Sequence, residues 1–227
     1  MVKPDQMVVF DMDGVLVDVS ESYRGAIVET VRHFTGKQIS AEMVQDYKNA
    51  GGWNNDWALS QKIAADLGVP VDYETVVEHF NKIFLGNGTD GLIARERWIP
   101  RPGLLESLAE RYRLAIFTGR LQCEAGITLR RFASELRFAR IICSDDVANG
   151  KPAPDGLLQI AGEFPGCCLW YVGDTVDDAR SARAANVKFI GIAAPASPRR
   201  EELAALLAQE NAVAVLDDIN TLETVLV

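Results

Sequence analysis

The feature that most constrains the fold is an alternation of short apolar runs with helix-like segments from residue 101 onward. Near-continuous Val, Ile, Leu and Phe content is typical of strands buried on both faces. Alternation of such strands with helices predicts a parallel sheet with right-handed crossovers. The runs lie at residues 113–117, 139–143, 168–173, 187–192 and 212–216, and residues 8–10 add a sixth. The chain is therefore predicted to be an α/β protein with a doubly wound parallel sheet.

Residues 15–99 have a different pattern, with several helical segments and turn signals but no recognisable strand. In one segment, helical spacing places six apolar side chains on one stripe: Tyr73, Val76, Val77, Phe80, Ile83 and Phe84. Such a stripe typically packs against neighbouring helices. We therefore predict a core formed by residues 1–14 and 100–227, with an all-helical domain of residues 15–99 inserted into it.

The charge balance limits the partners of the chain. Its 227 residues include 32 acidic and 23 basic side chains, a formal net charge of -9 with no Lys/Arg run. This composition predicts that neither nucleic acid nor a membrane surface is a partner. Residues 1–7 are too short and polar for a signal peptide, and no apolar run is long enough to span a membrane. We expect a cytoplasmic protein.

Polar residues follow several of the predicted strands. In an open parallel sheet, ligands bind beyond the carboxyl ends of the strands, so these residues form a candidate site. They are carboxylates, hydroxyls and one ammonium: Asp11, Asp13, Thr118, Ser144, Asp145, Asp146, Lys151, Asp174, Asp177 and Asp178. Hard oxygen ligands without clustered His or Cys favour Mg2+, which takes a phosphate ester as a natural further ligand.

The acidic pair at the end of the first strand supports this hypothesis. Side chains two apart in a strand share a face, so the chain must bend after Asp11 to give Asp11 and Asp13 separate roles. Gly14 permits that bend. Desolvated like charges are costly, and such a pair typically binds a cation or shares a proton.

Four segments resemble, in order, the motifs of the haloacid dehalogenase-like (HAD) hydrolase superfamily. They are DMDGVLVD at residues 11–18, the apolar run into Thr118, Lys151 within GKPAPD, and GDTVDD at residues 173–178. The resemblance spans residues 8–178. It implies a Rossmann-like core, and the insertion resembles the helical cap of the subgroup that carries its cap after the first motif.

The resemblance also implies roles for the residues of these motifs. Asp11 would be the nucleophile that forms an aspartyl-phosphate, and Asp13 would be the general acid and base. Mg2+ would be held by Asp11, the backbone carbonyl of Asp13 and Asp174, with support from Asp178.

The transferring phosphoryl group would be bound by Thr118, Gly119 and Lys151. Members of the superfamily that cleave carbon–halogen or phosphonate bonds lack an acid at the position of Asp13, so this residue indicates a phosphomonoester substrate.

We therefore predict a Mg2+-dependent phosphatase of a small phosphorylated metabolite, acting as a monomer or homodimer. A phosphomutase of the same superfamily is the nearest alternative, because it shares all four motifs. A receiver-type signalling module also gathers acids, a hydroxyl and a lysine at a sheet edge. Its phosphorylated aspartate belongs on a central strand after an earlier acidic pair, and it lacks a large helical insertion, so the chain departs from it twice.

Further residues have a less certain role by sequence alone. In the segment GGWNNDW at residues 51–57, Trp53, Asn54 and Asn55 either touch the substrate or form a turn between helices with buried tryptophans, and both interpretations stay open. Asp145 is a candidate for supporting the metal, whereas Asp177 fits a favourable acid in the first turn of a helix. Four arginines are candidates to meet a second anionic group on the substrate: Arg95, Arg97, Arg101 and Arg120.

Overall fold

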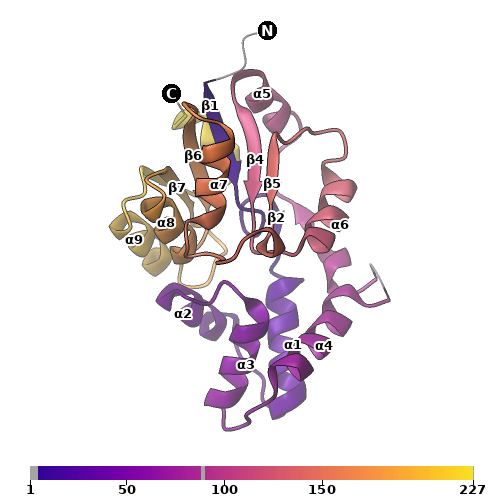
Figure 1. The fold of residues 1–227 in the computed structure, drawn as a ribbon. Helices are drawn as coiled ribbons and strands as arrows, with labels where there is room; N and C mark the ends of the chain where they lie inside the picture. The colour runs from indigo at the N-terminus through magenta and orange to yellow at the C-terminus, as the bar shows by residue number, and fades with distance from the viewer. Residues whose placement is uncertain (1–4, 88–89, 227) are drawn as a thin grey trace.

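A six-stranded parallel sheet forms the centre of the protein, seen here in a computed structural model that describes residues 5–87 and 90–226 (Figure 1). The strand order is β5-β4-β1-β6-β7-β8, which places the first strand of the chain in the middle. The strands are β1 (Gln6–Phe10), β4 (Arg113–Phe117), β5 (Arg140–Ile142), β6 (Cys168–Gly173), β7 (Lys188–Ile192) and β8 (Ala214–Leu216). All six predicted strands and the predicted fold class are confirmed.

Helices cover both faces of the sheet, because successive side chains of a buried strand point to opposite sides. In β1, Val8 and Phe10 pack into one apolar cluster, and Met7 and Val9 pack into another on the opposite face. The first cluster includes side chains of α5 and α6, and the second includes side chains of α7, α8 and α9. These helices are α5 (Leu104–Arg111), α6 (Gln122–Phe132), α7 (Asp155–Glu163), α8 (Val176–Ala184) and α9 (Arg200–Gln209).

Four helices form a second layer beyond the carboxyl ends of the strands (Figure 1). They are α1 (Tyr23–Thr35), α2 (Ala41–Ala50), α3 (Asp56–Asp66) and α4 (Tyr73–Leu85). On α4, Val76, Phe80 and Phe84 are fully buried, and the Phe84 ring centroid lies 4.0 Å from that of Tyr23 on α1. The predicted stripe therefore packs between helices. All four lie within residues 15–99, which we call the cap; its exact boundaries stay a prediction.

The cap segment also contains two short strands, contrary to the expectation that it would contain none. β2 (Val17–Asp18) pairs antiparallel with β3 (Arg97–Trp98), where the chain leaves the core and where it returns. Asp18 and Arg97 form an ion pair of 2.9 Å across this ribbon. Two residues per strand are too few to produce a recognisable alternation. Short 3-10 helices complete the described elements: η1 (Leu92–Arg95), η2 (Ser144–Asp146) and η3 (Ile219–Thr224).

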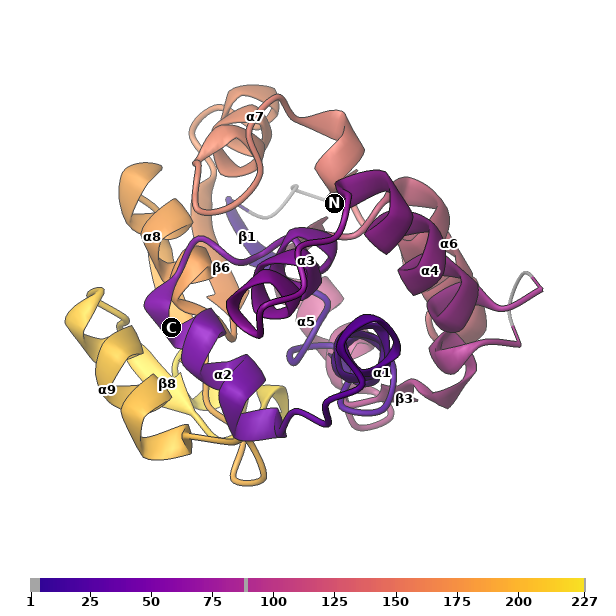
Figure 2. The ribbon, with the colours of Figure 1, turned by 90° about the horizontal axis from the view of Figure 1, so that it is seen from below.

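Figure 2, viewed from the cap side, shows the cap helices in front of the strand ends, with α2 beside α8 and α9. Across the described ranges, none of the helices has both the length and the apolar character to cross a membrane.

Candidate active site

Asp11 lies at the carboxyl end of the central strand and is almost completely buried, with 4% of its surface exposed. Its backbone N–H still donates to Val172 of β6 at 2.8 Å, so the sheet fixes the position of this residue. The chain then turns at Gly14, whose φ is 72°. The bend predicted from Gly14 is therefore present, and Asp11 and Asp13 make contacts with different residues.

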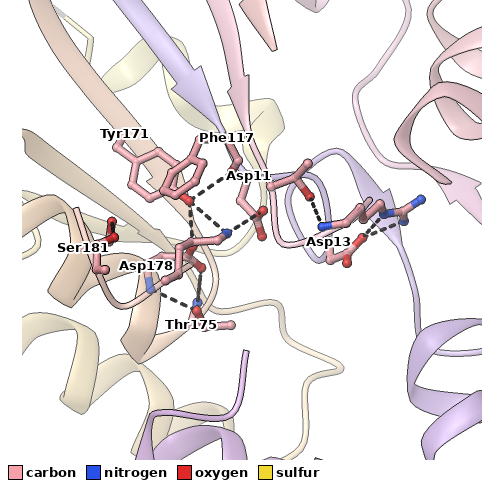
Figure 3. A network of polar contacts seen from close by, with 11 residues as sticks. Asp11, Asp13, Phe117, Tyr171, Thr175, Asp178 and Ser181 are labelled. Atoms are coloured by element: carbon pink, nitrogen blue, oxygen red, sulfur yellow. Dashed lines mark hydrogen bonds and ion pairs between the residues drawn. The ribbon is translucent and has the colours of Figure 1, made fainter. Parts of the chain in front are cut away.

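A buried lysine connects Asp11 to the motif after β6 (Figure 3). Lys151 Nζ donates to Asp11 Oδ1 at 2.8 Å and to Asp178 Oδ1 at 2.7 Å. The hydroxyl of Tyr171, on β6, lies 3.1 Å from the same ammonium and donates to Asp178 Oδ1 at 2.7 Å. Residues from β1, β6, α8 and the loop before α7 thus meet, as the strand-end argument predicts.

The ammonium of Lys151 affects the pKa values of its two carboxylate partners, Asp178 and Asp11, to different extents. Burial would raise the pKa of Asp178, but the adjacent Lys151 and several hydrogen bonds outweigh burial and lower it. Burial raises the pKa of Asp11 well above its ordinary value, because Lys151 only partly offsets burial and the nearby charges of Asp178, Asp13 and Asp174. Asp11 therefore lies in a site that favours a further positive charge.

The acids of this site suit a divalent cation. Carboxylate oxygens of Asp11, Asp174 and Asp178 lie within 4.8 Å of one another. Both oxygens of Asp178 already accept hydrogen bonds, since Oδ2 lies 2.6 Å from the Thr175 hydroxyl and 3.0 Å from the Thr175 N–H. The donor set is hard oxygen alone, which matches Mg2+. Asp11 and Asp174 could serve as direct ligands of such a cation, and Asp178 contacts Lys151 and Thr175 beside them.

Gly14 is required here because Asp174 packs directly against it. A Cβ at Gly14 would lie 2.0 Å from Asp174 Oδ2, whereas a Cβ at Gly36, which has a similar φ of 69°, would meet nothing within 4 Å. Both Gly→Ala substitutions carry the left-handed backbone penalty of about 1 kcal/mol. Only Gly14→Ala displaces Asp174. We expect it to raise the Mg2+ concentration for half-maximal activity about 10- to 100-fold, which is the usual loss of metal affinity when a residue that supports a metal ligand is changed. The same Mg2+ concentration for half-maximal activity in Gly14→Ala and Gly36→Ala would contradict this prediction.

The pKa of Asp174 links Mg2+ binding to pH. Burial, and secondarily the charge of Asp178, raises this pKa from 3.8 to about 7. Between these values the folded metal-free protein holds a proton that the unfolded chain has lost. Its stability therefore falls as pH rises toward about 7, then levels off. A cation replaces that proton, so Mg2+ should raise the melting temperature more at about pH 8 than at about pH 5.5.

Thermal unfolding in Mg2+ and in EDTA, compared at each pH, measures this difference, because titrations of groups away from the metal site cancel. Asp174→Asn is the control: it removes one of the two carboxyls of this site whose pKa is raised and should reduce the difference between the two pH values, while Asp11 still exchanges its own proton. An equal Mg2+ effect at both pH values in the parent chain would contradict the prediction.

Asp13 belongs to a second buried network, centred on Arg120. Arg120 Nε donates to Asp13 Oδ1 at 2.8 Å, and its Nη2 lies 2.8 Å from Glu96 Oε1. Its Nη1 donates to the Thr128 hydroxyl at 2.6 Å, and that hydroxyl donates to Glu96 Oε2 at 2.7 Å. The guanidinium is fully buried and lies over the Tyr23 ring, 4.9 Å from its centroid. Arg120 therefore connects Asp13, the predicted general acid and base, with Tyr23 at the start of the cap helices and with Glu96 where the chain returns from the cap.

The four arginines that the sequence suggested for binding a second anion of the substrate either pair with carboxylates of the protein or lie away from the cavity. Arg120 is balanced by Asp13 and Glu96. Arg97 pairs with Asp18, and Arg101 pairs with Glu223. Arg95 is exposed, and only Arg120 of the four is among the described residues that line the cavity beside Asp11.

This cavity, of about 380 Å³, lies between the core and the cap. The core contributes Asp11, Asp13, Gly119, Arg120, Glu124, Ser144, Val147, Ala148, Gly150, Lys151, Asp174 and Thr175. The cap and its first linker contribute Val19, Tyr23, Arg24, Lys48, Gly52, Asn54, Asn55, Asp56 and Trp57. A pocket that holds Asp11 at its floor and is covered by the cap has room for a small ligand.

Of the residues predicted to bind substrate, Asn54, Gly119 and Lys151 line the cavity, and Trp53 and Thr118 do not. Trp53 packs edge-on against Tyr47 with ring centroids 6.3 Å apart, whereas Trp57, four residues further on and in the first turn of α3, lines the cavity. Thr118 directly follows β4 and is 1% exposed, and its hydroxyl accepts from the Arg120 N–H at 3.2 Å.

Asp177 and Asp145 also have defined partners. Asp177 lies in the first turn of α8, as expected, but its carboxylate also accepts from the Gly52 N–H of the cap at 2.8 Å. Asp145 accepts from the Gln122 N–H at the start of α6. No local pattern reveals the contact of Asp177, because its partner is 125 residues away.

Comparisons with known proteins agree with this geometry. The sequence profile of the haloacid dehalogenase-like hydrolases matches residues 6–186. The chain is 34% identical over 204 residues to an imidazoleglycerol-phosphate dehydratase of Phytophthora nicotianae, covering 86% of this chain but only 45% of that longer protein. It is 26% identical to a phosphoglycolate phosphatase of Pseudomonas putida, covering 82% of this chain and 69% of that one.

Among solved structures, a haloacid dehalogenase-like protein of unknown function from Agrobacterium tumefaciens superimposes with a TM-score of 0.74. It shares 21% identity, and the match covers 97% of this chain and 96% of the other. Fold and site together define a parallel α/β protein with an acidic centre beneath an inserted helical cap. The chain belongs to the haloacid dehalogenase-like hydrolase family.

Proposed function

We propose that the chain is a Mg2+-dependent phosphatase that hydrolyses a small phosphomonoester through an aspartyl-phosphate on Asp11. The observation that carries this proposal is the position of Asp11. It is a buried carboxylate held by Lys151, within 4.8 Å of a carboxylate oxygen of Asp174, at the floor of a 380 Å³ cavity. Family membership and the phosphatase among the relatives support the same chemistry.

The first step forms a bond between an Asp11 carboxylate oxygen and phosphorus, while the bond from phosphorus to the leaving oxygen breaks. Lys151 orients Asp11 and neutralises part of the charge on the phosphoryl oxygens. Asp13 donates a proton to the leaving oxygen. The side chain of Asp13 is 30% exposed, which leaves it accessible from the cavity that it lines.

In the second step, Asp13 takes a proton from a water molecule that attacks the phosphorus of the aspartyl-phosphate. Phosphate leaves and the Asp11 carboxylate is regenerated. Mg2+ on Asp11 and Asp174 would supply positive charge next to the transferring group and orient it for in-line attack. The cap would close over the substrate, exclude bulk water and contribute to specificity.

The test is phosphate release from a panel of sugar, nucleotide, amino-alcohol and carboxylic-acid phosphates, with an imidazole-bearing phosphate added because of the Phytophthora relative. We expect Mg2+-dependent release from at least one compound, and none in EDTA. Isomerised sugar phosphate without phosphate release would instead favour the phosphomutase. A long-lived phosphoryl adduct without turnover would favour the signalling module. The cytoplasmic location, the absence of nucleic-acid and membrane partners and the monomer or homodimer state remain predictions.

A further inference from the structure

Arg24 lines the cavity, and no carboxylate of the described residues lies at hydrogen-bond distance from it. Among the described residues that line the cavity, Lys151 binds Asp11 and Asp178, Arg120 binds Asp13 and Glu96, and Lys48 binds Asp56. For Arg24, the nearest described carboxylate oxygen is Asp174 Oδ2, which lies 4.0 Å from Nη2. This separation is at the limit of an ion pair, so the charge of Arg24 is only weakly balanced.

Buried side chains of α2 hold this guanidinium in place. Arg24 Nη1 donates to Gln45 Oε1 at 2.9 Å, and Gln45 Nε2 donates to Asn49 Oδ1 at 2.8 Å. Gln45 is 2% exposed and Asn49 is 5% exposed. Two amides without charge therefore orient Arg24, which keeps its positive charge available to a ligand.

The position of Arg24 suits the leaving group of a substrate. In-line attack by Asp11 requires the leaving oxygen to lie on the far side of phosphorus, away from the end of β1. The cap lies on that side of the cavity and contributes Arg24 to its lining. A guanidinium there can donate two parallel hydrogen bonds to a carboxylate or phosphoryl group.

We infer that Arg24 is a specificity residue that binds a second anionic group, a carboxylate or phosphoryl group, on the leaving part of the substrate. This inference rests on the proposed phosphatase function and narrows its substrate class. It favours doubly anionic esters over neutral sugar and alcohol phosphates. The neutral amides beside Arg24 leave a substrate anion as the direct partner for its charge.

The test compares esters that differ mainly in the second anion. The pairs are phosphoglycolate with ethyl phosphate, and 3-phosphoglycerate with glycerol 3-phosphate; inorganic pyrophosphate represents a second phosphoryl group. The parent chain should prefer the anionic member in kcat/KM. Arg24→Gln should reduce that selectivity ratio about 10- to 100-fold, the effect of one charge-assisted contact, mainly through KM. Arg24→Lys should retain part of the preference.

Arg32→Gln is the matched control, because Arg32 lies on the same helix with its side chain 56% exposed. It should leave both kcat/KM values unchanged. Loss with phosphoglycolate or phosphoglycerate identifies a carboxylate ligand, and loss with pyrophosphate identifies a phosphoryl ligand. Circular dichroism verifies that each variant is folded.

Three outcomes overturn the inference. One is a parent chain without preference for anionic esters, and another is a selectivity ratio that Arg24→Gln leaves within about twofold. The third is an equal loss of kcat/KM on both members of a pair together with a higher Mg2+ concentration for half-maximal activity. That result would mean that Arg24 acts by positioning Asp174 and does not bind the second anion. Hydrolysis of the neutral esters alone would leave the phosphatase function intact, whereas no hydrolysis of any ester in the full panel would refute both.

Discussion

Replacing Asp11 by Asn is expected to reduce turnover by about 10^4-fold or more, because the amide cannot form the phosphoryl-enzyme bond. The variant should remain folded. Burial and neighbouring acids raise the pKa of Asp11, so its charge is unfavourable in the metal-free protein, and Lys151 keeps Asp178 as a partner. Phosphate release from the best substrate of the panel, together with a melting curve, separates lost chemistry from lost structure.

Asp145→Asn is the control for this variant. Asp145 lies in the loop after β5, at the same edge of the sheet, but it is not among the described residues that line the cavity. Its substitution should change turnover by no more than a few-fold. Undiminished turnover in Asp11→Asn would refute the assignment of the nucleophile. Mass spectrometry of the quenched parent chain should find the phosphoryl group on Asp11.

Replacing Arg120 by Met is expected to lower the free energy of unfolding by about 3–5 kcal/mol. The guanidinium is fully buried between Asp13 and Glu96, and the side chain of Glu96 is only 1% exposed. Removing the cation leaves Glu96 as an uncompensated buried charge, and burial already raises the pKa of this residue. Urea denaturation of the metal-free protein measures the change.

Two further variants test the cause of this loss. Arg130→Met, on the exposed face of α6, removes an arginine without exposing a buried acid and should change stability by less than about 0.5 kcal/mol. Adding Glu96→Gln to Arg120→Met should recover part of the loss, because the remaining side chain carries no charge. A loss in Arg120→Met no larger than that in Arg130→Met would contradict the prediction.

The sheet was predictable because each strand carries its own signal. Residues 114–117 are all apolar, and the structure buries them against helices on both faces. The site follows from the same signal, because the chemistry lies in the residues directly after such strands. Asp11 and Asp174 directly follow their strands, whereas Lys151 and Asp178 lie further along the chain and were indicated by the resemblance to the family; the structure brings all four together.

Other residues of the site were not predictable, because their roles depend on distant neighbours. Tyr171 fits an ordinary apolar strand, and only the fold reveals that its hydroxyl contacts Lys151 and Asp178. Glu96 and Arg120 are 24 positions apart in the printed sequence, and no local spacing signals their ion pair. For Trp53 the sequence leaves two interpretations open, because no local pattern shows which side chains of residues 51–57 face a cavity; in the structure Trp53 packs against Tyr47, and Trp57 of α3 lines the cavity.

The contacts of the cap with α8 and with the start of α9 have a consequence for substrate entry. The Gly52 N–H binds Asp177, and Arg199 pairs with Asp46 of α2 at 2.9 Å. Gly51 lies so close to Arg180 that a Cβ there would be 2.1 Å from its guanidinium. Water can replace each of these polar partners when the cap and these helices separate. Their separation at this contact therefore exposes few apolar atoms. The cap is therefore held against the core on this side by hydrogen bonds and ion pairs that water can replace.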